Sequence, residues 1–343
     1  MVSRQMNILL TCAGRRNYMV DYFQSAVGLE GEVHVANNVQ DLSSMAVCSR
    51  RALLPSIYDE HYIERLLDYC IAHGIELIVP LFDLELPILA AHRSQFADAG
   101  ITVAVSTEEV CAICLDKVRT HEFLQEVGLE TTPYYTTVDT ALDAVEKGHS
   151  AFPLFVKPRV GMGSIGLHKA NSSLQLRACF EMAEQEIESS YLQHESSAYD
   201  GHTVMIQGML SGDEYGLDVV NDLEGQHACT IVKKKLGMRS GETDGAVTQQ
   251  VPALEHLGRQ IGEALGHRGN LDVDVFWDGE KAYVLEMNPR FGGGYPFSHQ
   301  AGANLPAAYM AWAQGKAADP EWLTVEPEIT SVKGISMHRI STG

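Results

Sequence analysis

The chain lacks any apolar run long enough to cross a membrane, and its first residues lack the apolar core of a secretion signal. Positive charge is also scarce, because 25 Lys and Arg stand against 45 Asp and Glu, giving a formal net charge of -20. Such a charge repels nucleic acids and anionic membranes, and the one dense basic cluster is Lys233 to Lys235. We therefore expect a cytoplasmic protein with no nucleic-acid partner and no membrane partner.

Two common nucleotide-binding patterns are absent as well. No segment matches GxxxxGK[ST], and the turn after the first predicted strand, Cys12 to Arg16, lacks GxGxxG. The seven cysteines are odd in number and lack the paired spacing of a zinc site, which indicates reduced thiols. A dinucleotide-dependent oxidoreductase is therefore only a distant alternative.

What is present first is an alternation of strands and helices. Strands are predicted at 7–11, 32–36, 77–80 and 102–105, and helices at 60–73 and 86–99. This order is typical of a parallel α/β sheet, so we expect a Rossmann-like domain over residues 1–115.

A second part begins at Asp116, which can cap a helix running to Val127 and stopping at Gly128. Strands and helices of α+β type follow. We expect this part to span 116–315, with a small lobe at about 130–210 and a C-terminal lobe at about 211–315. Residues 316–343 form a C-terminal segment.

The most informative stretch runs from Leu271 to Arg290 and reads as two alternating strands around a turn. A three-residue loop, Asp278 to Glu280, separates an acidic face from an apolar one. The acidic face would carry Asp272, Asp274, Phe276, Ala282, Val284, Glu286 and Asn288. The apolar face would carry Val273, Val275, Trp277, Tyr283, Leu285 and Met287.

Carboxylate and amide oxygens gathered on one strand face suit a hard cation, with Mg²⁺ as the natural candidate. Glu286 and Asn288 lie two residues apart on one strand and can converge on one or two ions. A solvated polar face is the alternative.

Upstream, an apolar strand ends at Lys157 and is followed by a loop containing Gly161, Gly163, Ser164 and Gly166. Glycines let backbone N–H groups approach a phosphate closely. Taken alone, this stretch is better explained as an ordinary hairpin loop. It supports a phosphate-binding site only in combination with the acidic strand pair.

Together these segments resemble the ATP-grasp superfamily, in particular its carbamoyl-phosphate-synthase-like and biotin-carboxylase-like members. The resemblance covers nearly the whole chain, including the Rossmann-like part that precedes the ATP-grasp domain. It is carried by Asp116-Lys117, Phe155 to Pro158 with its glycine loop, Gly212 to Asp218, and Glu286-Met-Asn288-Pro-Arg290-Phe-Gly-Gly.

The resemblance implies a set of roles in binding ATP and Mg²⁺, for which Mn²⁺ could substitute. Lys117 and Lys157 would contact the phosphates under the glycine loop, which includes Gly161, Gly163 and Ser164. Backbone at Gly208, Met209 and Leu210 would bind adenine, and Glu214 the ribose. Asp274, Glu286 and Asn288 would ligate the metal, and Arg290 would stabilise the transferred phosphoryl group.

Two positions depart from the family pattern. Gln207 stands where glutamate is common, which leaves its contact with adenine or ribose open. Asp274 replaces a longer glutamate, which could change the geometry of the ion.

Further charged residues have two readings each. We predict that Lys235 and Arg239 face the anionic substrate, although a solvated strand edge explains each equally well. Asp83 and Glu85 follow the C-terminal end of a predicted strand, where α/β sheets place ligands. Exposed acids that cap the next helix are the favoured explanation for this pair.

The resemblance implies an enzyme that phosphorylates a small-molecule carboxylate and joins the acyl phosphate to an amine. A bicarbonate-activating, carboxylase-like enzyme is the first alternative, and a non-catalytic ATP-binding subunit is the second. Neither substrate is identified by the sequence, and a homodimer is left open.

Overall fold

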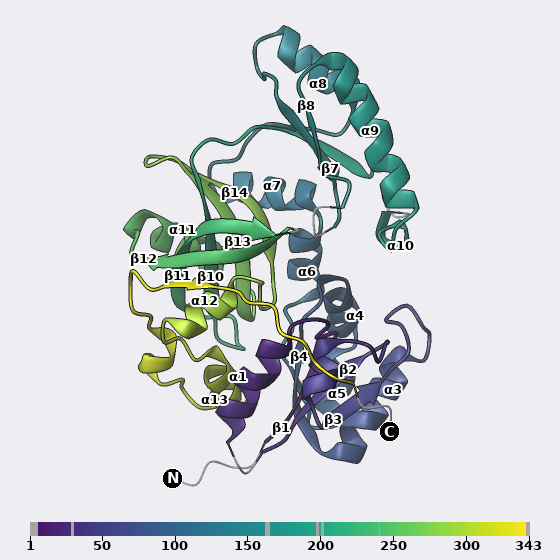
Figure 1. The fold of residues 1–343 in the computed structure, drawn as a ribbon, viewed down its shortest axis with the longest axis vertical. Coiled ribbons are helices and arrows are strands. Elements are labelled where there is room, and N and C mark those ends of the chain that lie inside the picture. Colours follow the sequence, from purple (N-terminus) through teal and green to yellow (C-terminus); the bar gives the residue numbers. More distant parts are fainter. Residues whose placement is uncertain are drawn as a thin grey trace.

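A computed structural model describes residues 6–28, 31–161, 165–196, 199, 202–239 and 241–340. Three β-sheets carry the fold, and they are stacked along the long axis of the molecule (Figure 1). Within the described part, no helix is both long and apolar enough to span a membrane.

The N-terminal sheet is parallel, with strand order β3-β2-β1-β4-β5. Its strands are β1 (Asn7–Thr11), β2 (Val33–Asn37), β3 (Arg50–Leu53), β4 (Ile75–Pro80) and β5 (Thr102–Val103). Its helices are α1 (Asn17–Val27), α2 (Ser43–Val47), α3 (Tyr62–His73), η1 (Asp83–Glu85), α4 (Leu86–Ala91) and α5 (Arg93–Asp98). The predicted Rossmann-like sheet is confirmed, although the helix expected at 86–99 breaks at His92.

Two helices, α6 (Glu108–Leu115) and α7 (Lys117–Glu126), lead out of this sheet. Asp116 caps α7 as predicted, because its Oδ1 accepts the N–H of Val118 at 2.9 Å. The same carboxylate binds the guanidinium of Arg159 at 2.8 and 2.7 Å. One aspartate therefore begins the helix and fastens it to the small lobe.

The small lobe, at the top of Figure 1, has a four-stranded antiparallel sheet in the order β6-β9-β7-β8. Its elements are β6 (Tyr134–Tyr135), α8 (Val138–Glu146), β7 (Leu154–Pro158), β8 (His168–Ala170), α9 (Ser173–Glu188), α10 (Gln193–Ser196) and β9 (Val204–Gly208). It buries a hydrophobic core of its own, built around residues such as Leu154, Val156 and Leu176.

The third sheet is antiparallel, in the order β14-β13-β10-β11-β12-β15. Its strands are β10 (Asp213–Asn221), β11 (His227–Arg239), β12 (Glu242–Gln249), β13 (Gly269–Trp277), β14 (Ala282–Asn288) and β15 (Thr330–Val332). Its helices are α11 (Pro252–Leu265), α12 (Tyr295–Gln300), α13 (Leu305–Ala313) and η3 (Pro320–Leu323). The C-terminal segment thus returns to the sheet as its edge strand.

The third sheet shares a core with the N-terminal domain. Phe291, Tyr295 and Leu305 pack in one cluster with Phe23 and Leu10 of the N-terminal domain. The two parts are therefore held together by continuous apolar packing, and the cavity between them has rigid walls.

The acidic hairpin forms, but its loop differs from the prediction. The turn has four residues, Asp278 to Lys281, since Trp277 pairs with Ala282. Asp278 Oδ1 accepts the N–H groups of Glu280 at 2.9 Å and Lys281 at 2.7 Å, which closes this longer turn.

A bulge at Leu285 then restores the register, so that Asp274 lies directly opposite Glu286 and Asp272 opposite Asn288. The shared face of these four residues is confirmed. The placement of residues 282–285 was wrong by one position: Ala282 and Val284 pack with the core, whereas Tyr283 pairs with Phe276 and Leu285 lines a cavity.

The interpretation of Asp83 and Glu85 as exposed helix caps was wrong. Both side chains are buried, and neither makes a capping hydrogen bond. Glu85 is fully buried and accepts hydrogen bonds from Thr11 Oγ1 at 2.9 Å and Tyr62 OH at 2.5 Å. These bonds hold the turn that follows β4 and thereby position Asp83.

Burial raises the pKa of Glu85 above its ordinary value, more than the bonds from Tyr62 and Thr11 lower it. The folded state therefore favours the neutral acid, and its stabilising contribution is lost as the pH rises through the raised pKa. We expect Glu85→Gln to be more stable than the wild type at pH 8, with the difference shrinking toward pH 5. Urea denaturation across this range measures it, with exposed Glu146→Gln as control. Parallel pH profiles for Glu85→Gln and the wild type would contradict the prediction.

Candidate functional site

Two cavities meet at the acidic strand pair. The larger, about 550 Å³, lies between the small lobe and the third sheet, and the smaller, about 330 Å³, lies between the third sheet and the N-terminal domain. Asp274 and Glu286 line both cavities. The strand pair therefore forms part of the wall of both cavities.

Two buried lysines dominate the polar part of the larger cavity. Lys117 Nζ donates to the carbonyl of Gly161 at 2.7 Å, and Lys157 Nζ donates to Gln207 Oε1 at 2.7 Å. In the described ranges neither ammonium has a carboxylate within ion-pair distance. Burial lowers the pKa of both, and with Lys117 nearby the pKa of Lys157 falls to about 7. Two uncompensated cations make this a site for an anion.

Gln207 is held by residues that the sequence did not point to. Its Nε2 contacts Thr132 Oγ1 and lies 3.3 Å from His121 Nε2, which leaves its carbonyl oxygen facing Lys157. His121 lies on α7 and Thr132 in the segment after it, so only the fold brings them together. Gln207 thus orients a lysine inside the protein.

The rest of the larger cavity is apolar and suits the base of a nucleotide. Met209 and Leu210 line it directly after β9, and Glu214 lines it at the start of β10. The apolar wall includes Phe155, Ile165, Leu167, Met238, Phe276 and Leu285, none of which was predicted to line a nucleotide site. Gly161 lines the cavity as well, whereas Gly163 and Ser164 lie outside the described residues.

At the junction, Lys235 lies between carboxylates. Its Nζ contacts Asp274 Oδ1 at 2.7 Å and Glu214 Oε1 at 2.7 Å. Burial raises the pKa of Asp274 to about 7, opposed by Lys235 and reinforced by Asp272 and Glu286. A further positive charge at this point would stabilise the ionised carboxylates.

The donors at the junction fit Mg²⁺. Asp274 and Glu286 face each other across the strand pair, and Asn288 follows on the same face of β14. In the described chain no three His, Cys, Asp or Glu side chains form a metal cage by themselves. Mg²⁺ usually takes one or two carboxylates and completes its shell with phosphate and water, so this sparse set is adequate.

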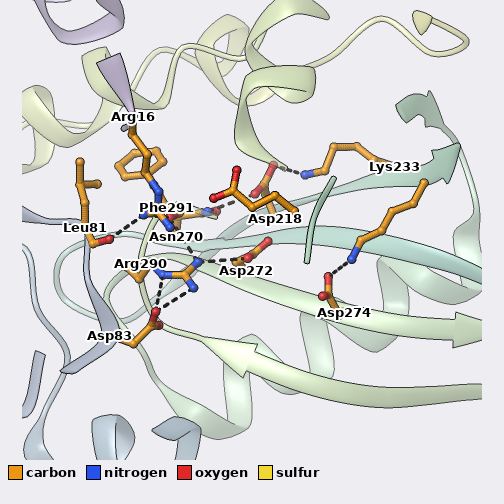
Figure 2. A network of polar contacts seen from close by, with 12 residues as sticks. Arg16, Leu81, Asp83, Asp218, Lys233, Asn270, Asp272, Asp274, Arg290 and Phe291 are labelled. Atoms are coloured by element: carbon orange, nitrogen blue, oxygen red, sulfur yellow. Dashed lines mark hydrogen bonds and ion pairs between the residues drawn. The ribbon is translucent and has the colours of Figure 1, made fainter. Parts of the chain in front are cut away.

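Arg290 ties the smaller cavity together (Figure 2). Its Nε and Nη2 donate to Asp83 Oδ2 at 3.0 and 2.9 Å, and its Nη1 donates to Asp272 Oδ2 at 3.1 Å. Asp272 lies against Gly292, where an added Cβ would stand 2.0 Å from the carboxylate carbon. Glycine at 292 is therefore a steric requirement for this ion-pair network.

The remaining cations differ in position. Arg16 lines the smaller cavity and donates to the carbonyls of Leu81 at 2.6 Å and Phe291 at 3.1 Å. Arg239 lies at the exposed end of β11, where it pairs with Asp244 at 2.7 Å and lines neither cavity. The structure thus brings Lys235 to the smaller cavity but not Arg239.

Two known protein families match separate parts of the chain. Residues 8–104 match the PylC-like N-terminal domain, and residues 200–335 match the family described as ATP-grasp in the biosynthetic pathway with Ter operon. The chain carries domains of the ATP-grasp family. The acidic strand pair and Lys235 fall inside the second match.

Relatives of this ATP-grasp protein include the carbamoyl-phosphate synthase of Methanobrevibacter smithii, 23% identical over 308 residues, which are 87% of this chain and 78% of the relative. The present chain, however, spans only 19 to 25% of the length of several bacterial carbamoyl phosphate synthase large chains.

Solved structures agree in fold. The biotin carboxylase domain of the Hydrogenobacter thermophilus 2-oxoglutarate carboxylase, in complex with MgADP and bicarbonate, has a TM-score of 0.70 at 17% identity, covering 92% of this chain and 71% of the other. The L-amino acid ligase of Bacillus licheniformis has a TM-score of 0.68 at 18% identity, covering 91% and 76%. The family uses ATP and Mg²⁺.

We predict that nucleotide binding is accompanied by proton uptake at Lys157. At pH 8 an ammonium with a pKa of about 7 is mostly neutral, and an adjacent phosphate restores its charge, so about one proton is taken up. Titration calorimetry with MgADP in two buffers of different ionisation enthalpy measures this number. Lys157→Met should lose the uptake, whereas exposed Lys281→Met should retain it. Equal uptake in both variants would show that another group titrates.

Proposed function

We propose that this protein is an ATP- and Mg²⁺-dependent ligase that phosphorylates a small-molecule carboxylate and transfers the acyl group to an amine. The proposal is carried by the meeting of two cavities at Asp274 and Glu286. One cavity has the cations and apolar walls that a nucleotide needs, and the other has the arginine and acids of a polar substrate site.

On the nucleotide side, Lys117 and Lys157 would hold the phosphates, since no carboxylate among the described residues neutralises them. Met209 and Leu210 would line the adenine site, with Glu214 at the ribose. Asp274, Glu286 and Asn288 would hold Mg²⁺, which when bound neutralises charge on the phosphate oxygens.

On the substrate side, a carboxylate oxygen would attack the γ-phosphorus, and the bond from that phosphorus to the β–γ bridging oxygen would break. The products are an acyl phosphate and ADP. A neutral amine then attacks the acyl carbon, a C–N bond forms, the bond from the acyl carbon to the phosphate oxygen breaks, and inorganic phosphate leaves with the proton that the amine loses. Lys157 and Arg290 are cations placed in advance for charge on the transferred group, which is the main requirement for this transfer.

The relatives support this assignment. Carbamoyl-phosphate synthases, N5-carboxyaminoimidazole synthetases and an L-amino acid ligase appear among the similar proteins. All are named as synthases, synthetases or ligases, and the ATP-grasp match covers the strand pair on which the proposal depends.

We predict that a screen of amino acids and small carboxylates will reveal a pair that stimulates ADP formation, with a product identifiable by mass spectrometry. Glu286→Gln removes one metal-binding charge and should lower kcat by at least about 100-fold. Glu280→Gln, on the exposed turn of the same hairpin, is the matched control and should keep wild-type rates. ADP formation that is unaffected by Glu286→Gln would sink the metal assignment.

A further inference from the structure

One oxygen in the smaller cavity has no partner. Asp83 is 5% exposed, and its Oδ2 accepts both hydrogen bonds from Arg290. Its Oδ1 is buried and receives no hydrogen bond from any described residue. Asp83 nevertheless lines the cavity. A buried carboxylate oxygen without a donor is costly, so a donor from a ligand would be favourable here.

The charge around Asp83 indicates the kind of donor. Arg290 is shared between Asp83 and Asp272, so two carboxylates face one guanidinium and one negative charge remains (Figure 2). Two other cations that line the cavity, Arg16 and Lys233, are engaged by other groups. Lys233 pairs with Asp218, and Arg16 binds two backbone carbonyls. A positively charged N–H donor, such as an ammonium group, would complete the pairing.

A second, opposite feature lies at the rim of the same cavity. Arg15 follows the first strand, lines the cavity and is exposed. No hydrogen bond or ion pair engages its guanidinium within the part of the chain that the structure describes. An arginine with all its donors free can bind a carboxylate through two parallel hydrogen bonds.

Arg15 and Asp83 come from neighbouring places in the fold. β1 and β4 are adjacent parallel strands, and each residue follows the C-terminal end of its strand. A cavity of about 330 Å³ lies at the lower end of the range for small-molecule sites. A small molecule with an ammonium group at one end and a carboxylate at the other matches both features.

We propose that the amine substrate is an amino acid, bound with its ammonium group on Asp83 Oδ1 and its carboxylate on Arg15. This inference rests on the proposed ligase function and names its acceptor. The N-terminal domain, rather than the ATP-grasp part, then selects the acceptor, and Glu85 positions Asp83 for that purpose.

The test compares L-alanine with two truncated analogues: ethylamine, which lacks the carboxylate, and propionate, which lacks the ammonium group. The set is repeated for the other protein amino acids. Binding to the full chain with MgADP is measured by calorimetry. We expect at least one amino acid to bind at least about tenfold more tightly than both of its truncated analogues, because each loses a charged hydrogen-bonded contact.

Two variants test which residue binds which end of the ligand. Asp83→Asn should remove the preference for the amino acid over the deaminated acid, and Arg15→Ala the preference over the decarboxylated amine. Asp272→Asn, which removes the surplus negative charge beside Asp83 and keeps Asp83 Oδ1 in place, should weaken the preference over the deaminated acid and leave the preference over the decarboxylated amine intact. Arg177→Ala, an exposed arginine on α9 that lines neither cavity, is the control for loss of charge.

The outcomes separate this inference from the proposed function. If no amino acid binds better than its truncated analogues, or if Asp83→Asn keeps the preference, the inference is wrong. ADP formation stimulated by a carboxylate and a simple amine would then leave the ligase function standing. Absence of ADP formation with every carboxylate and amine would overturn the ligase function itself.

Discussion

Two carboxylates facing each other across adjacent strands are the constraint on which the rest of the site depends. Asp274 and Glu286 are a direct cross-strand pair, and like charges in this arrangement repel. Lys235 offsets part of the repulsion, and the pKa of Asp274 still rises to about 7. In the larger cavity the situation is reversed, because Lys117 and Lys157 are buried amines whose pKa is lowered and which have no carboxylate partner among the described residues. A magnesium nucleotide bound as we propose would satisfy both, because its cation would meet the acids while its phosphates would meet the lysines.

Arg290 and its two aspartates make the N-terminal domain part of the same site. Asp83 and Arg290 are 207 residues apart in the chain, and their ion pair lies where the third sheet meets the N-terminal domain. Shared apolar packing fixes these two parts against each other. The small lobe instead has a separate core and is joined to the N-terminal side by peripheral contacts, such as the hydrogen bond from Tyr58 OH to Glu195 Oε1 at 3.0 Å and the ring contact of Phe82 with Tyr191. A displacement of the small lobe would therefore open the larger cavity without disrupting a hydrophobic core.

How far the sequence could be read depended on whether the deciding interaction was local. Strand alternation placed Asp272, Asp274, Glu286 and Asn288 on one face, because a period of two is a property of the backbone. The turn length and the bulge at Leu285 were missed, since several loops satisfy the same pattern. Asp83 resembled a helix cap because its partner lies on a distant segment.

Arg239 shows the same limit within one strand. It lies four residues after Lys235 and by alternation should share its face. The pairing of β11 with β12 shifts register on both sides of Gly237, so the alternation does not carry through. Arg239 ends up exposed beside Asp244. Register shifts of this kind depend on the partner strand, and a single strand's residue pattern does not reveal them.

The acidity of the protein is compatible with the anion site that we propose, because exposed and buried charges act over different distances. Exposed charges are screened within about 8 Å at physiological salt, so a net charge of -20 acts mainly on large partners that meet the surface. Lys117 and Lys157 lie inside a cavity with apolar walls, where screening is weak and their attraction for phosphate is strong. The same global charge that disfavours nucleic acids is therefore compatible with the buried nucleotide site that we propose, because the local arrangement of charge determines the ligand.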